Sequence, residues 1–160
     1  MSRIAIVTAA LALAACGGSS GPATHFSATM SPANEVPSTT SSGTGSATYS
    51  VDGGTVTYTV TFSGLTANAS AGHIHVGPAG VNGAVTVPFT LPTPAAKSGT
   101  INGSFTAADV KAAATPDGGV SVAAGDYNGL LTLMRTGNTY TNIHTSTYPN
   151  GEIRGPNQPQ

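Results

Sequence analysis

The feature that most constrains the fold is a run of strict two-residue alternation at residues 55–62. Threonines there alternate with larger apolar side chains: Val56, Tyr58, Val60 and Phe62. Successive side chains of a β-strand point to opposite faces, so the run predicts an antiparallel strand with one face in a core. A second alternating run, residues 46–52, precedes Gly53-Gly54. Two such runs joined by Gly-Gly predict a β-hairpin.

Further short apolar runs follow at intervals, separated by Gly-, Pro- and Asn-rich turns. They predict strands at residues 24–31, 71–76, 84–91, 99–105, 140–145 and 152–154. Helical patterns predict two short helices, at residues 106–114 and 126–135. Many short strands with few helices indicate an all-β, antiparallel domain, either a sandwich or a Greek-key barrel.

Composition excludes several classes of function. Only 7% of residues are charged, the net charge is −1 and tryptophan is absent, so we expect no nucleic-acid surface. The sequence lacks the P-loop and H-E-x-x-H patterns, and its six acidic residues fall mostly in turns. We therefore expect a protein without catalytic activity.

The first residues are typical of an export signal. Arg3 precedes an apolar run at residues 4–13, which is too short to span a bilayer. Residues 13–16 (LAAC) look like a bacterial lipobox, which predicts a signal peptide at residues 1–15 and a lipidated Cys16. A plain secretory signal with a chance cysteine is the alternative. Because the chain has one cysteine, no disulfide is expected within it.

This organisation predicts a protein held in the cell envelope by its lipid anchor. Gly17 follows the cysteine, and by resemblance to enteric sorting signals this favours the outer membrane. Residues 16–23 would be the lipidated cysteine and a flexible tether, residues 24–156 the domain, and residues 157–160 a tail.

Three of the four histidines lie in two of the predicted strands, residues 71–76 and 140–145, and are candidates for metal ligands. His73 and His75 are two residues apart, so their side chains leave the same strand face. Two imidazoles placed in this way can converge on one ion, and His144 in another strand can join them. His25, near the tether, is a candidate fourth ligand.

An all-imidazole site suits Cu²⁺, Zn²⁺ or Ni²⁺; copper is favoured because it stands highest in the affinity series, with zinc as the main alternative. Met30 or Met134 could add a thioether ligand, although core packing is the more ordinary role for both. In the competing interpretation the histidines are structural, no cofactor is bound, and the chain is an interaction module for a protein partner or the envelope. A redox enzyme that uses the bound metal is a third, weaker alternative.

Glu152 and Arg154 share one face of the last predicted strand. Glu152 could accept a hydrogen bond from an imidazole of the metal site and so fix its tautomer, with Arg154 beside it. The alternative is a surface ion pair of little energetic consequence.

Together, several segments resemble the CHRD domain, a family named from chordin. They are residues 26–30 (FSATM), 34–37 (NEVP), 73–80 (HIHVGPAG), 140–145 (YTNIHT) and 148–155 (YPNGEIRG). The resemblance implies an extracellular β-rich module without an assigned reaction. The H-x-H strand is also similar to the copper strand of Cu/Zn superoxide dismutases, which are Greek-key β-sandwiches. This chain has too few histidines for two metals, so we expect that sandwich fold without dismutase activity.

Overall fold

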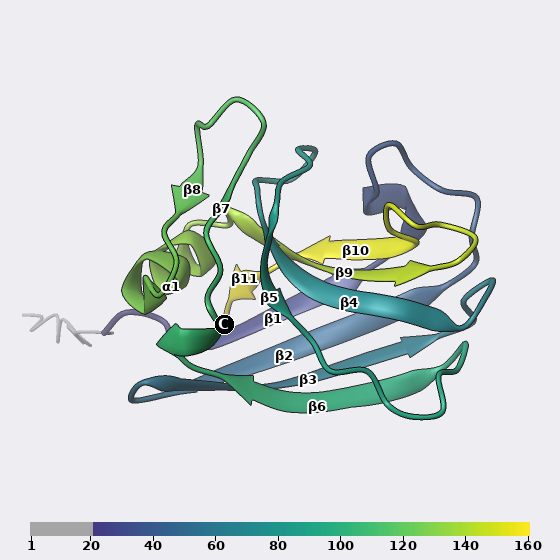
Figure 1. Ribbon diagram of the computed structural model, residues 1–160, viewed down its shortest axis with the longest axis horizontal. Helices are drawn as coiled ribbons and strands as arrows, with labels where there is room; N and C mark the ends of the chain where they lie inside the picture. Colours follow the sequence, from purple (N-terminus) through teal and green to yellow (C-terminus); the bar gives the residue numbers. More distant parts are fainter. Residues whose placement is uncertain (1–20) are drawn as a thin grey trace, which may run out of the picture.

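The computed structural model describes residues 21–160, which form a β-sandwich of two antiparallel sheets (Figure 1). The predicted signal peptide and Cys16 lie outside the described residues. The larger sheet has the strand order β11-β1-β2-β3-β6 and the smaller sheet the order β10-β9-β4-β5. The strands of the larger sheet are β1 (His25–Met30), β2 (Thr44–Asp52), β3 (Thr55–Ser63), β6 (Gly99–Phe105) and β11 (Gln158–Pro159). The strands of the smaller sheet are β4 (Ala69–Val76), β5 (Val85–Pro88), β9 (Thr139–Thr145) and β10 (Ile153–Pro156).

The alternating runs form the predicted hairpin of β2 and β3. Tyr49 pairs with Tyr58, and Val51 with Val56. The apolar residues of β3 are buried between the sheets and its threonines face solvent, as the alternation predicts. The fully buried side chains of the core come from both sheets and from the helix: Phe26, Met30, Val56, Val60, Ile74, Ile101, Phe105, Leu130, Met134, Ile143 and Ile153.

The sheets are joined by a Greek-key connection. The chain passes from β3 into the β4–β5 hairpin of the smaller sheet and then returns as β6, which pairs with β3. The same arrangement leaves β4 beside β9. Residues far apart in the sequence therefore share the outer face of the smaller sheet.

One of the two predicted helices forms. Helix α1 (Tyr127–Arg135) begins at Asp126, whose carboxylate accepts a hydrogen bond from the backbone N–H of Gly129. A Cβ at Gly129 would lie 2.0 Å from that carboxylate, so the glycine that weakens the helix pattern makes room for the cap.

The prediction of a second helix, at residues 106–114, is wrong. The Asp109 carboxylate accepts hydrogen bonds from Thr106, and together they close only the 3-10 turn η2 (Ala107–Asp109). Val110 then packs into the core, and β7 (Ala113–Ala114) pairs with β8 (Ser121–Val122). Tertiary pairing of the backbone thus outweighs the helix propensity of the alanines.

The expected tail, residues 157–160, is part of the sheet. Gln158 pairs with Ser27, and Pro159 with Phe26. Asn157 is fully buried, where its side chain binds Thr141 and Thr139. A second 3-10 turn, η1 (Pro32–Asn34), lies in the long connection between β1 and β2.

Candidate metal centre

The outer face of the smaller sheet carries the three predicted histidines. On β4, Ile74 points into the core, so His73 and His75 share the opposite face. On β9, His144 pairs with Ala71, which lies two residues before His73 and therefore on the same face of β4. The structure therefore brings together side chains that are 69 to 71 residues apart in the sequence.

The three imidazoles form one compact cluster. One ring nitrogen from each lies within 4.8 Å of the other two. The ring centroids of His73 and His144 are 4.9 Å apart, and those of His73 and His75 are 5.3 Å apart. Nitrogens bound tetrahedrally to one ion at about 2.0–2.1 Å are separated by about 3.3 Å, so a modest contraction of the cluster would bring all three to a metal.

Two of the three tautomers are fixed by the backbone. Nδ1 of His75 donates to the carbonyl of Gly83 at 2.9 Å, and Nδ1 of His144 donates to the carbonyl of Pro149 at 3.0 Å. Their Nε2 atoms therefore carry lone pairs. His144 Nε2 lies 3.1 Å from Nδ1 of His73, and His75 Nε2 is buried without a hydrogen-bond partner among residues 21–160.

Burial keeps these rings neutral. Burial and the neighbouring His144 lower the pKa of His73 to about 4. Burial also lowers the pKa of His75 to about 4, against the hydrogen bond to Gly83, and it lowers the pKa of His144. Neutral imidazole is the form that binds a metal, so protons compete little for these nitrogens near neutral pH.

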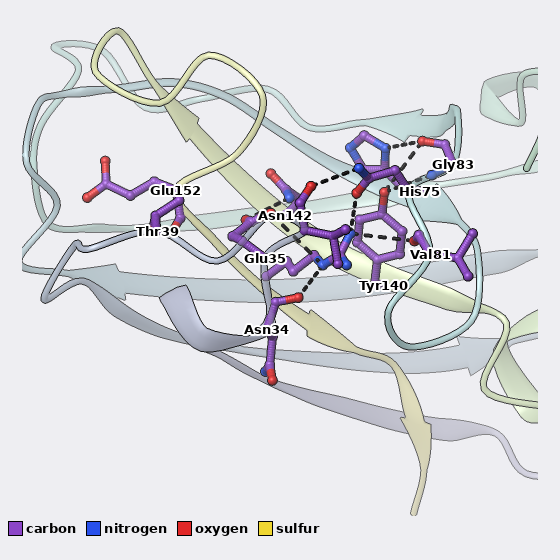
Figure 2. Close-up of polar contacts among 12 residues, drawn as sticks. Asn34, Glu35, Thr39, His75, Val81, Gly83, Tyr140, Asn142 and Glu152 are labelled. Carbon is purple, nitrogen blue, oxygen red and sulfur yellow. Dashed lines mark hydrogen bonds and ion pairs between the residues drawn. The ribbon is translucent and has the colours of Figure 1, made fainter. Parts of the chain in front are cut away.

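Tyr140, which was not predicted from the sequence to belong to the site, lies against His75 (Figure 2). Its ring stacks on His75 with centroids 4.8 Å apart and an angle of 8° between the rings. Its hydroxyl accepts a hydrogen bond from Gly83 N at 3.1 Å. Tyr140, Asn142 and His144 alternate along β9, so their common face could have been recognised from the sequence.

The prediction that Glu152 accepts a hydrogen bond from an imidazole of the metal site is wrong. Glu152 is fully buried, and its carboxylate accepts hydrogen bonds from the hydroxyls of Ser41, Thr66 and Thr145 and from the backbone N–H of Thr66. Burial alone would raise the pKa of Glu152, but these hydrogen bonds hold it below the ordinary value. Glu152 thus ties two loops to β9 and forms no hydrogen bond with any of the three histidines.

Arg154 is buried as well, so the alternative of a surface Glu152–Arg154 pair is also wrong. Its guanidinium carbon lies 4.6 Å from the centroid of the Tyr140 ring, and its Nη1 donates to Asn82 Oδ1 at 2.8 Å. Its Nε lies 3.9 Å from a carboxylate oxygen of Glu35. Arg154 therefore reaches the cluster indirectly, through the ring of Tyr140 that contacts His75.

Glu35 was identified from the sequence only as part of the family resemblance. It accepts a hydrogen bond from the side-chain amide of Asn142 at 3.0 Å (Figure 2). Asn142 pairs with His73 on one side and with Arg154 on the other. Burial raises the pKa of Glu35 to about 7, although the charge of Arg154 lowers it.

The remaining candidate ligands lie elsewhere. His25 is exposed on β1 in the other sheet and is not part of the histidine cluster. Met30 and Met134 are both buried in the hydrophobic core. No helix among residues 21–160 is long and apolar enough to cross a membrane.

Comparison with known proteins decides the family. The family model of the CHRD domain matches residues 26–156, most of the chain. The chain belongs to the CHRD domain family. No curated protein and no solved structure matches it. Four of the segments that carry the CHRD resemblance meet at the outer face of the smaller sheet: they supply Glu35, the H-x-H strand, the β9 histidine, and the Pro149 carbonyl with Arg154.

Proposed function

We propose that this CHRD-domain protein binds one transition-metal ion, copper in preference to zinc, through His73, His75 and His144. The role is binding or buffering of the metal and not catalysis. The protein would act outside the cytoplasm, anchored to the cell envelope, with the outer membrane the favoured location, by a lipid on Cys16.

One observation carries the metal proposal. His75 and His144 each donate their Nδ1 proton to a backbone carbonyl, which leaves Nε2 as a lone-pair donor within reach of the other rings. Metal-ligating histidines usually donate their second ring nitrogen in this way, because the hydrogen bond fixes the tautomer and the orientation. His75 Nε2 is buried and has no hydrogen-bond partner within the described part of the chain, which supports the proposal further, since an unpaired buried polar atom is costly.

His73 would complete the ligand set. Without a metal, its Nδ1–H donates to Nε2 of His144, because that nitrogen has no proton. An ion between the rings would replace this proton, and His73 would carry its N–H on Nε2 instead. His73 is only half-buried, so one side of the ion would face solvent.

The donor set favours copper. The cluster among residues 21–160 contains imidazole nitrogens and no thiolate or carboxylate. Nitrogen sites bind divalent first-row metals with an affinity that peaks at Cu²⁺ and falls at Zn²⁺.

The test is elemental analysis of the untagged protein, followed by titration with Cu²⁺ and Zn²⁺. We expect one equivalent of copper, lost in a His73→Ala/His75→Ala double variant and kept in His25→Ala, which removes a histidine outside the cluster. Absence of stoichiometric metal, together with a melting temperature that EDTA and copper leave unchanged, would instead support a metal-independent interaction module.

The anchor is tested separately. We expect the wild-type protein to incorporate labelled fatty acid and to sediment with membranes, and Cys16→Ala to do neither. Unmodified wild-type protein in the soluble fraction would refute the anchor and leave the metal proposal intact.

A further inference from the structure

A pocket of about 230 Å³ lies on the far side of Tyr140 from the histidine cluster. Its walls come from η1 and the residues after it, from the loop that follows β4, and from β9 and β10. The main lining residues are Ala33, Glu35, Val36, Ala79, Tyr140 and Arg154. None of the three histidines lines it. The pocket and the proposed metal site therefore share a wall, the ring of Tyr140, but are separate.

The guanidinium of Arg154 is incompletely paired. Nε donates to the carbonyl of Asn34, and Nη1 donates to Oδ1 of Asn82 and to the carbonyl of Val81. Nη2 has no hydrogen-bond partner among residues 21–160, although only 3% of Arg154 is exposed. A buried arginine nitrogen of this kind is costly unless an acceptor reaches it.

The nearest carboxylate neutralises Arg154 poorly. Oε2 of Glu35 lies 3.9 Å from Nε, beyond hydrogen-bond distance, and Oε1 of Glu35 accepts a hydrogen bond from the side-chain amide of Asn142. Burial also raises the pKa of Glu35 to about 7, so near neutral pH this side chain carries only part of a negative charge. Glu35 therefore balances the charge of Arg154 only in part.

We propose that this pocket binds a small monocarboxylate, with its carboxylate on Arg154 and its carbon chain against the apolar wall. Charge-assisted hydrogen bonds from a guanidinium to a carboxylate are strong, and Nη2 can donate them, because among residues 21–160 only Nε and Nη1 of Arg154 are engaged. Val36, Pro78, Ala79 and Pro156 supply the apolar surface. The nearby Glu35 carboxyl disfavours a dianion, such as a phosphate ester, more than a monoanion.

The size of the pocket limits the ligand. Pockets for drug-sized ligands occupy about 300–1,000 Å³, so this smaller one suits an acid of a few carbons. So small a ligand has little surface to bury, and we expect dissociation constants in the millimolar range.

The experiment is an NMR titration of the full, metal-free protein, in EDTA, with acetate, propionate, butyrate and valerate. Each acid is compared with its primary amide, which has the same shape without the charge. We expect shifts of the Ala79 and Gly80 amides, with the acid binding about tenfold or more tightly than the amide, because a hydrogen bond to a charged group is the stronger one.

Two variants locate the binding site. Ala79→Leu fills the pocket without touching the buried polar groups and should abolish the shifts, whereas Ala95→Leu, in the exposed loop before β6, should leave them unchanged. Equal binding of acids and amides would overturn the proposal, as would shifts that survive Ala79→Leu or the absence of any shift. EDTA keeps this result independent of the metal proposal.

Discussion

Replacing Glu152 by glutamine tests whether this buried carboxylate supports the fold or the histidine cluster. The side chain keeps its size and loses its charge. In the wild type, one carboxylate oxygen accepts from Ser41 and from the Thr66 N–H, and the other accepts from the hydroxyls of Thr66 and Thr145. The glutamine oxygen can keep one of these pairs, while its NH₂ group faces the other pair of donors.

The magnitude follows from that geometry. Two charge-assisted hydrogen bonds contribute about 1.5–3 kcal/mol each, and two neutral bonds of about 1 kcal/mol each replace them where the hydroxyls turn to accept. We therefore expect Glu152→Gln to lower the free energy of unfolding by about 2 kcal/mol. The affinity for copper should change little, since Glu152 forms no hydrogen bond with any of the histidines.

The assay is urea denaturation at pH 7 in EDTA, followed by a copper titration of the folded variant. Asp52→Asn, which removes an exposed carboxylate at the β2–β3 turn, is the control and should cost little. Unchanged stability combined with a large loss of copper affinity would refute the reasoning and restore Glu152 to the neighbourhood of the metal.

Three further predictions concern the cluster. His144→Ala should weaken copper binding far more than His25→Ala in a competition titration, and equal losses would mean that the ligand set is wrong. The pKa of His75 is about 4 in the folded state and about 6.5 in the unfolded state. As the pH falls below about 6.5, the imidazole of His75 is therefore protonated in the unfolded chain before it is protonated in the folded one, which stabilises the unfolded state. Metal-free wild type should therefore lose up to about 3 kcal/mol relative to His75→Gln between pH 7 and pH 4, measured by urea denaturation; parallel pH profiles would contradict this. Gly83→Ala would place a Cβ 1.6 Å from the Val76 carbonyl oxygen, so the Gly83 carbonyl must leave His75. We expect copper affinity to fall about tenfold or more, whereas Gly54→Ala, in open space, should not change it.

Features that depend on neighbouring residues could be predicted from the sequence. Alternation predicts the β2–β3 hairpin, and the spacing of His73 and His75 predicts their common face, because both depend on the two-residue period of a strand. The helical pattern at residues 106–114 fails because the backbone there pairs with other strands, an interaction that no local propensity contains.

In the candidate site, too, some residues could be predicted from the sequence and others could not. The three histidines could be proposed from strand patterns, but which groups surround them depends on loops distant in the sequence. Glu152 receives its hydrogen bonds from Ser41 and Thr66, 111 and 86 residues away. Arg154 meets Glu35 across a similar separation, so neither partner could be found from spacing alone.

The pairing of β11 with β1 has a consequence for how the domain folds. The Ser27–Gln158 contact joins nearly opposite ends of the domain, and Gln160 N donates to the carbonyl of His25. Contacts of such high sequence separation require a large loop to close before they stabilise anything, which slows folding. Until residues 158–160 pair with β1, that edge of β1 can pair with another chain. A domain truncated before these residues should therefore be prone to edge-to-edge association.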